Sequence, residues 1–219
     1  MKSPGTDIEY RRLTTPRAAA IAGILFGLLF SASLVLLRNA LPEEFTGDTT
    51  WITSGTLKIR WALGMMPFAG IAYLWFIGVA RDRLGEFEDR FFSSVFYGSS
   101  LLFLAMIFVS MAVAGAILIT YPMVTGETAD YSAIIFGRAV MVQISNVYAL
   151  RMAGVTMISL ATIWIRTGLM PRWLTVTTYL LALTLLVVVN FNLWITLIFP
   201  VWVMMISVET LVKNLRRST

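Results

Sequence analysis

Long runs of apolar residues without a single charge are the feature that most constrains this chain. The run from 18 to 37 lies between Arg17 and Arg38, and the run from 61 to 80 lies between Arg60 and Arg81. Each run has the roughly 20 residues that an α-helix needs to cross the hydrocarbon core of a bilayer. Because that core offers the backbone no hydrogen-bond partner, such runs are expected to be helical. The chain is therefore predicted to be an all-α integral membrane protein.

The composition agrees with lipid as the solvent. Charged residues make up 13% of the chain, and hydrophobic residues make up 58%. A soluble domain carries about 25% charged residues, so a soluble fold has too little polar surface to cover this much apolar material. The net charge is +5. We interpret this excess as the basic collar of a membrane protein, and we expect no nucleic-acid partner.

Six transmembrane helices are expected, within a single transmembrane domain over residues 1–219. The fourth apolar run is interrupted by Arg151, and the last run, 173–208, is too long for one helix. Its only polar break is Asn190-Phe191-Asn192, where we expect a tight hairpin. The predicted spans are 18–37, 61–80, 93–120, 144–165, 173–189 and 193–212.

An even number of spans places both termini on one side of the membrane. Of the 17 Lys and Arg residues, twelve fall on the side of the termini and four on the other side. Because Lys and Arg concentrate in cytoplasmic segments, both termini are predicted to be cytoplasmic. The expected location is the inner (plasma) membrane.

The first span carries a stripe of small residues. Ala19, Gly23, Gly27 and Ser31 follow one another at intervals of four, so they share one helix face. In lipid such a face lets two backbones approach closely. The stripe is interpreted as a surface for packing against another helix of the same chain, with a homodimer face as the alternative.

Two prolines are predicted to bend the helices that contain them. Pro67 lies inside the second span, and Pro200 lies inside the sixth. Each lacks the N–H that an interior helical position donates. The bends are either static or act as hinges. Static bends are the commoner case, because proline is tolerated and frequent in membrane helices.

Arg151 is the unusual charge, because it lies inside a span. An intramembrane charge is expensive and is by default a candidate for function. Tyr148 is its neighbour on the helix surface, and Asn190 and Asn192 are candidate neutral partners. The alternatives are that Arg151 extends to the headgroups, binds a lipid headgroup or another anionic ligand, or contacts another subunit.

Catalysis and cofactor binding have little support in the sequence. The chain has no His and no Cys, which removes the usual ligands for haem, zinc, copper and iron–sulfur clusters and the commonest general base. Glu43, Glu44 and Asp48 precede the second span, but they lack the spacing of a metal-binding loop. We therefore expect no enzyme activity, no metal site and no cofactor.

A loop motif carries a resemblance. The segment 163–174 reads IWIRTGLMPRWL, and the segment 76–85 reads FIGVARDRLG. In both respects the chain resembles uncharacterised six-helix multi-pass membrane proteins of actinobacteria and related bacteria, in which an R-T-G-x-x-P-R-W-L loop joins two helices. The resemblance covers most of 62–208 and implies a bacterial inner membrane and a six-helix fold. It implies no activity.

Two hypotheses of function follow. The first is an accessory or scaffold subunit beside a larger membrane complex, such as a lipid or small-molecule transport assembly, with other membrane subunits or a second copy as partners. The second is a small carrier or binder of an anionic or amphipathic ligand, such as membrane lipid, that uses Arg151.

Overall fold

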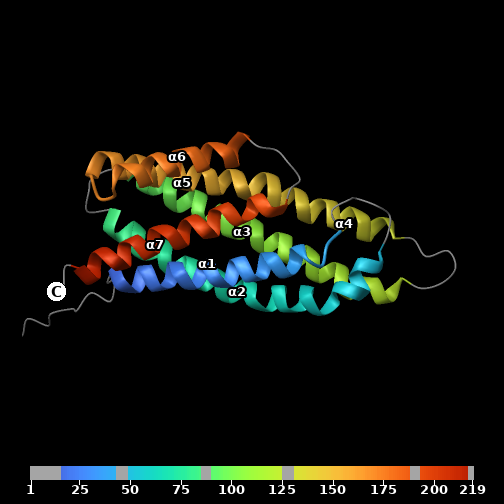
Figure 1. Ribbon diagram of the computed structural model, residues 1–219. Helices are drawn as coiled ribbons and strands as arrows, with labels where there is room; N and C mark the ends of the chain where they lie inside the picture. The colour runs from blue at the N-terminus through green and yellow to red at the C-terminus, as the bar shows by residue number, and fades with distance from the viewer. Residues whose placement is uncertain (1–15, 43–48, 85–89, 125–130, 188–192, 217–219) are drawn as a thin grey trace, which may run out of the picture.

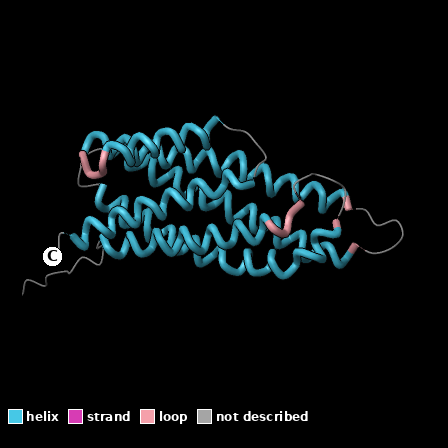
Figure 2. Tube along the Cα trace, in the orientation of Figure 1, coloured by secondary structure: helices cyan, strands magenta, loops and turns pink. Residues whose placement is uncertain are grey.

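The structure is a computed structural model that describes residues 16–42, 49–84, 90–124, 131–187 and 193–216. Helices make up almost all of the described chain, with short loops between them (Figure 2). The elements are α1 Pro16–Arg38, α2 Thr50–Leu84, α3 Arg90–Thr120, a 3-10 turn Tyr121–Met123, α4 Ser132–Gln143, a π-helical segment Ile144–Ala149, α5 Leu150–Thr167, α6 Arg172–Val187, a 3-10 segment Leu193–Leu197 and α7 Ile198–Arg216.

The prediction of an all-α multi-pass membrane protein is confirmed at that level. Within the described residues, five helical stretches are long and apolar enough to cross a membrane, and α6 is a shorter apolar helix. The α1 helix packs between α2 and α7, α3 packs against α2, α4 and α5, and α6 packs on α5. Figure 1 shows these helices running side by side along one long axis.

Two helical stretches begin earlier in the chain than the predicted spans, so they are longer at one end of the bundle. The second span was expected to begin at residue 61, but α2 begins at Thr50. The fourth was expected to begin at residue 144, but α4, the π-helical segment and α5 form one continuous stretch from Ser132 to Thr167. The extra residues are moderately polar and keep the helical backbone, so a search for apolar runs finds only the lipid-facing part.

Pairs of arginines indicate where the bilayer lies along the bundle. Arg17 and Arg38 on α1 are 21 residues apart, and so are Arg60 and Arg81 on α2. At 1.5 Å per residue each pair spans about 32 Å, close to the roughly 30 Å of a hydrocarbon core. On this spacing we expect the residues of α2 before Arg60, the end of α3 and α4 to project beyond the hydrocarbon.

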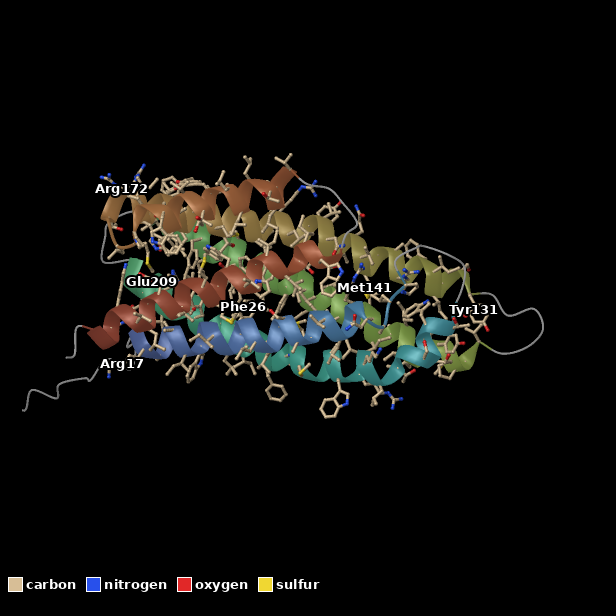
Figure 3. All side chains as sticks on the ribbon, viewed as in Figure 1. Arg17, Phe26, Tyr131, Met141, Arg172 and Glu209 are labelled. Atoms are coloured by element: carbon tan, nitrogen blue, oxygen red, sulfur yellow. The ribbon has the colours of Figure 1, made fainter. Side chains whose placement is uncertain are left out.

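The two ends of the bundle differ in what they carry. Figure 3 shows Arg17, Arg172 and Glu209 at one end and Tyr131 at the other. The first residues of α1 and the last of α7 lie together at the former end, which we call the terminal end; the opposite end is the distal end (Figure 1). The turn at the terminal end between α5 and α6 contains Gly168, whose φ of 64° ends α5 in the left-handed conformation that glycine tolerates.

The small residues of α1 lie against α7. A Cβ atom added to Gly27 would lie 2.9 Å from Met204 Cβ and 3.0 Å from the Pro200 carbonyl oxygen. One added to Gly23 would collide with the Ser207 hydroxyl. The two backbones therefore approach closely at these two positions, within one chain. Ala19 is buried at the terminal end of the same stripe, and Ser31 lies toward its distal end.

An aromatic cluster fills the space between α1, α2, α3 and α7. Phe26 and Tyr73 have ring centroids 4.6 Å apart, and Phe103 and Phe199 have centroids 4.5 Å apart. The cluster continues from Phe199 to Trp202, at 5.6 Å. Tilted and edge-on pairs of this kind are favourable beyond the area that they bury.

Hydroxyl groups join helices that the aromatic cluster does not. The Ser99 and Thr156 hydroxyls lie 2.9 Å apart and link α3 to α5. The Trp202 indole donates to the Thr178 hydroxyl at 2.9 Å and links α7 to α6. Such bonds matter in a membrane, where apolar burial gives a helix no preference for protein over lipid.

The contact between α1 and α7 leads to a stability prediction. Gly27→Ala would place its methyl group against the α7 backbone, and we expect it to lower the free energy of unfolding by about 1–3 kcal/mol. Gly78→Ala is the matched control, because a Cβ at Gly78 meets nothing within 4 Å. Removing a helical glycine there should be neutral or stabilise by up to about 1 kcal/mol. Thermal unfolding in detergent, followed by circular dichroism, measures both, and equal effects would contradict the close contact.

Candidate functional site

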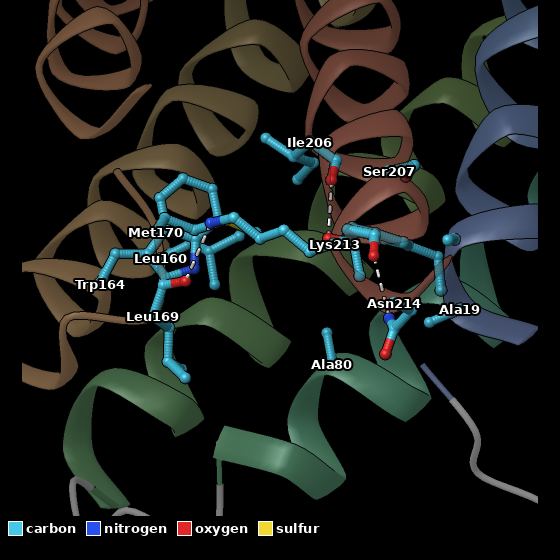
Figure 4. A pocket seen from close by; sticks show the side chains of 13 residues that line it. Ala19, Ala80, Leu160, Trp164, Leu169, Met170, Ile206, Ser207, Lys213 and Asn214 are labelled. Carbon is cyan, nitrogen blue, oxygen red and sulfur yellow. Dashed lines mark hydrogen bonds between the residues drawn. The ribbon is translucent and has the colours of Figure 1, made fainter. Parts of the chain in front are cut away.

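A cavity lies at the terminal end, between α1, α2, α5 and α7. It has a volume of about 200 Å³. Figure 4 shows Trp164 and Leu160 on one side and the α7 side chains on the other. Its lining residues are Ala19, Ala20, Phe76, Ala80, Leu160, Trp164, Leu169, Met170, Ile206, Ser207, Thr210, Lys213 and Asn214. We call it the terminal cavity.

Small residues line part of the terminal cavity, and the aromatic side chains Phe76 and Trp164 line another part. The α1 and α2 walls are lined by the alanines at 19, 20 and 80, whose side chains leave room. The Trp164 ring lies 6.3 Å from the Trp202 ring, which in turn is held by the Thr178 hydroxyl. The aromatic wall therefore has a fixed position. The deep part of the cavity is mainly apolar, with the buried Ser207 hydroxyl as a polar group beside Ile206.

The mouth of the terminal cavity is polar and carries one positive charge. The Lys213 ammonium lies 3.5 Å from the Glu209 carboxylate on the same helix and 3.5 Å from the Leu169 carbonyl oxygen across the opening. Thr210 and Asn214 also line the mouth, but both side chains donate hydrogen bonds to the α7 backbone. Thr210 donates to the Ile206 carbonyl oxygen at 2.7 Å, and Asn214 donates to the Thr210 carbonyl oxygen at 2.9 Å. Charge-assisted hydrogen bonds are usually 2.7–2.9 Å long. The Lys213 contacts are longer, so its ammonium can turn toward another anion.

The residues that the sequence singled out for ligand binding lie outside the terminal cavity. Arg151 is half-buried and donates from Nη1 to the Val147 carbonyl oxygen of its own helix at 3.1 Å. Tyr148 is exposed. Arg151 lines neither the terminal cavity nor the small distal cavity described below. Asn190 and Asn192 lie outside the described residues, so their expected pairing with Arg151 stays a prediction.

The two prolines occupy different kinds of position. Pro67 lies in the interior of α2, which continues through it as one helix. Pro200 lies in the first turn of α7, directly after the 3-10 segment Leu193–Leu197. In a first turn the missing N–H has no intrahelical partner to lose. The structure shows a change of helix type just before Pro200, and the expected bend at this proline stays a prediction.

A buried arginine at the distal end was not singled out by the sequence. Arg138 on α4 is only 4% exposed. Its Nη2 donates to the Pro42 carbonyl oxygen at 2.6 Å, and its guanidinium lies 5.6 Å from the centre of the Trp51 ring. These contacts tie α4 to the start of α2 and to the segment after α1. In the sequence Arg138 looks like any basic residue outside a span, because its burial depends on partners distant along the chain.

The described part of the chain contains no cluster of three or more Asp or Glu side chains that could hold a metal ion. Glu43, Glu44 and Asp48 lie outside the described residues. Comparisons with protein-family models, curated proteins and solved structures found no match. The resemblance of the 163–174 loop to other bacterial membrane proteins stays a prediction.

Arg138 leads to a second stability prediction. Arg138→Gln removes the donor to Pro42 and the cation over Trp51, and hydrogen bonds to charged groups contribute about 1.5–3 kcal/mol. We expect a loss of that size in the free energy of unfolding. Arg60→Gln, at an exposed position of α2, is the control and should change it by less than about 0.5 kcal/mol. Unfolding curves that do not separate the two variants would show that the buried contacts contribute nothing.

Proposed function

We propose that this protein binds an anionic amphiphile with a single acyl chain in the terminal cavity. The observation that carries the proposal is the pairing of an apolar, Trp-walled interior with a lysine at the mouth. A site of this kind matches a molecule with one charged end and one apolar end. It supports the ligand-binding hypothesis with different residues from those predicted: Lys213 and Trp164 in place of Arg151.

The geometry sets limits on the ligand. Along α7 the cavity extends from Lys213 to Ile206, which is seven residues or about 10 Å of helix. An acyl chain enters to about that depth while its headgroup stays beside Lys213. A fatty-acid carboxylate and the phosphate of a single-chain lipid share the chemistry that Lys213 recognises. The volume of about 200 Å³ favours one chain over two.

The proposal includes the orientation of the protein. Lys and Arg are more numerous at the terminal end than at the distal end. This bias supports a cytoplasmic terminal end. The mouth of the cavity then faces the cytoplasmic leaflet, where anionic lipids attract basic residues.

Binding is tested with a fatty acid that carries bromine atoms on its chain. Bromine quenches tryptophan fluorescence at contact, and Trp164 lines the cavity, so the wild-type protein should be quenched saturably. Lys213→Gln should bind the acid about three- to tenfold more weakly, the effect of one partly exposed charge pair. Lys58→Gln is the matched control, since Lys58 is an exposed lysine on α2 outside the terminal cavity and contacts the Asn39 carbonyl oxygen.

Two further samples separate cavity binding from adsorption to the lipid-facing surface. Trp164→Phe should lose most of the saturable quenching. A brominated alcohol of the same chain length should bind wild type and Lys213→Gln equally, because it lacks the charge. Equal acid binding by wild type and Lys213→Gln would contradict the proposal.

A second candidate function is an accessory subunit, and exposed apolar side chains at the distal end favour it. Phe136 is 70% exposed and Met123 is 74% exposed. Both lie on the distal side of the level of Arg38, so in this proposal the hydrocarbon of the bilayer does not cover them. Exposed apolar groups outside the bilayer often mark contacts with another protein. The partner in this proposal is another membrane protein that contacts α3 and α4.

Purification in mild detergent at native expression tests the accessory role. We expect a stoichiometric partner with the wild type and its loss in Phe136→Ser, because the change removes the most exposed aromatic ring of α4. Phe91→Ser is the control at the opposite end, where Phe91 is 69% exposed. A wild-type protein that purifies alone as a monomer would count against this role.

A further inference from the structure

A second, smaller cavity lies near the distal end, where α1, α3, the π-helical segment and the 3-10 segment before α7 meet. Its volume is about 30 Å³. Both Arg38 and Ser145 line it, and Ser145 lies 21 residues before Arg166, the same interval that separates Arg17 from Arg38. The cavity therefore lies at the distal boundary of the hydrocarbon, within reach of water. We call it the distal cavity.

Asn146 on the π-helical segment has an incomplete set of hydrogen bonds. It lines the distal cavity and is 6% exposed. Its Oδ1 accepts from the Ser145 hydroxyl at 3.2 Å, but its Nδ2 has no partner. A buried amide N–H without an acceptor is unfavourable, and native structures nearly always satisfy it with protein or ordered water.

The hydroxyls around Asn146 offer the complementary groups. Ser110 donates to the Met141 carbonyl oxygen at 2.9 Å. The single proton of the Ser145 hydroxyl is shared among three acceptors: the same Met141 oxygen at 3.0 Å, the Val142 carbonyl oxygen at 3.2 Å and Asn146 Oδ1 at 3.2 Å. Each hydroxyl oxygen keeps lone pairs that can accept a further bond. The distal cavity thus presents amide N–H donors on Asn146 and acceptors on Ser110 and Ser145. The Arg38 guanidinium also lines it, and none of its lining residues is acidic.

We propose that the distal cavity binds water, one or two molecules, which accept from Asn146 Nδ2 and donate to the Ser110 and Ser145 oxygens. Water both accepts and donates, so it satisfies this mixed set, whereas a bare cation would face N–H groups and a bare anion would face lone pairs. A cavity needs about 10–15 Å³ and two to four polar partners to hold one water, and both conditions are met.

The proposed water lies where the long helix changes from α-helical to π-helical, at the segment Ile144–Ala149. π-Helical turns are rare and widen the helix locally, often at functional positions. Here the turn separates α4, which projects beyond the bilayer, from α5, which crosses it. The bound water adds a polar link between this turn and α3, which already pack on each other. The site is independent of the amphiphile proposed for the terminal cavity.

A high-resolution structure of the full-length protein in a lipid mesophase tests the proposal. We expect a water peak within hydrogen-bond distance of Asn146 Nδ2 and of at least one of the two serine oxygens. The Ser110→Ala/Ser145→Ala double variant should lose the peak or weaken it severalfold. Ser159→Ala is the control, since Ser159 is buried on α5, bonds to the Val155 carbonyl oxygen at 2.8 Å and does not line the distal cavity.

Three results would overturn the assignment. They are an empty cavity in the wild type, an Asn146 amide bonded to a protein group instead, and a peak that gives an anomalous signal after exchange into bromide, which would show an anion. The wild-type density decides the question by itself if the double variant does not fold.

Discussion

The close approach of α1 and α7 is the contact on which the rest of the bundle depends. Two glycines, Gly23 and Gly27, leave no room for a Cβ atom against α7. In lipid, helices gain little from burying apolar surface against each other, and association depends on close packing and hydrogen bonds. Once the backbones meet, the rings of Phe26 and Phe199 reach each other, with centroids 6.3 Å apart. A bulkier residue at either glycine would separate the helices that carry the aromatic cluster.

The same contact explains why the terminal cavity lies where it does. The α7 helix is held to α1 along the stripe of small residues, and the Trp202–Thr178 hydrogen bond links it to α6 farther from the terminal end. The Trp164 and Trp202 rings bring α5 and α7 together at the inner side of the opening. Nearer the terminal end, Lys213 of α7 makes long contacts with Leu169 and Met170 of the turn after α5. The space between them is the cavity. Its apolar walls are side chains that would otherwise pack on one another.

The sequence predicts the helices, and it does not show which distant side chains come together, for physical reasons. An apolar run reports the thickness of the lipid, so the predicted spans 61–80 and 144–165 cover only part of α2 and of the Ser132–Thr167 stretch. The helices continue past these limits because hydrogen bonding along a helix does not require lipid. Arg151 is the only charge within a predicted span, and its guanidinium donates to the Val147 carbonyl oxygen of its own helix. Arg138 and Lys213 gain their surroundings from residues far away in the chain, which no local pattern shows.

The matched spacing of the arginine pairs on α1 and α2 has a consequence for where the protein can reside. Two adjacent helices carry the same interval of 21 residues between charges, so the bundle has one hydrophobic length of about 32 Å. A bilayer that is thinner by several ångströms would expose apolar rings to headgroups, and a thicker one would draw guanidinium groups toward the acyl chains. Each ångström of mismatch is modestly unfavourable, and such differences sort proteins among membranes. The stability of the bundle therefore depends on bilayer thickness through the two arginine pairs. A change in lipid composition that alters the thickness would affect both helices together.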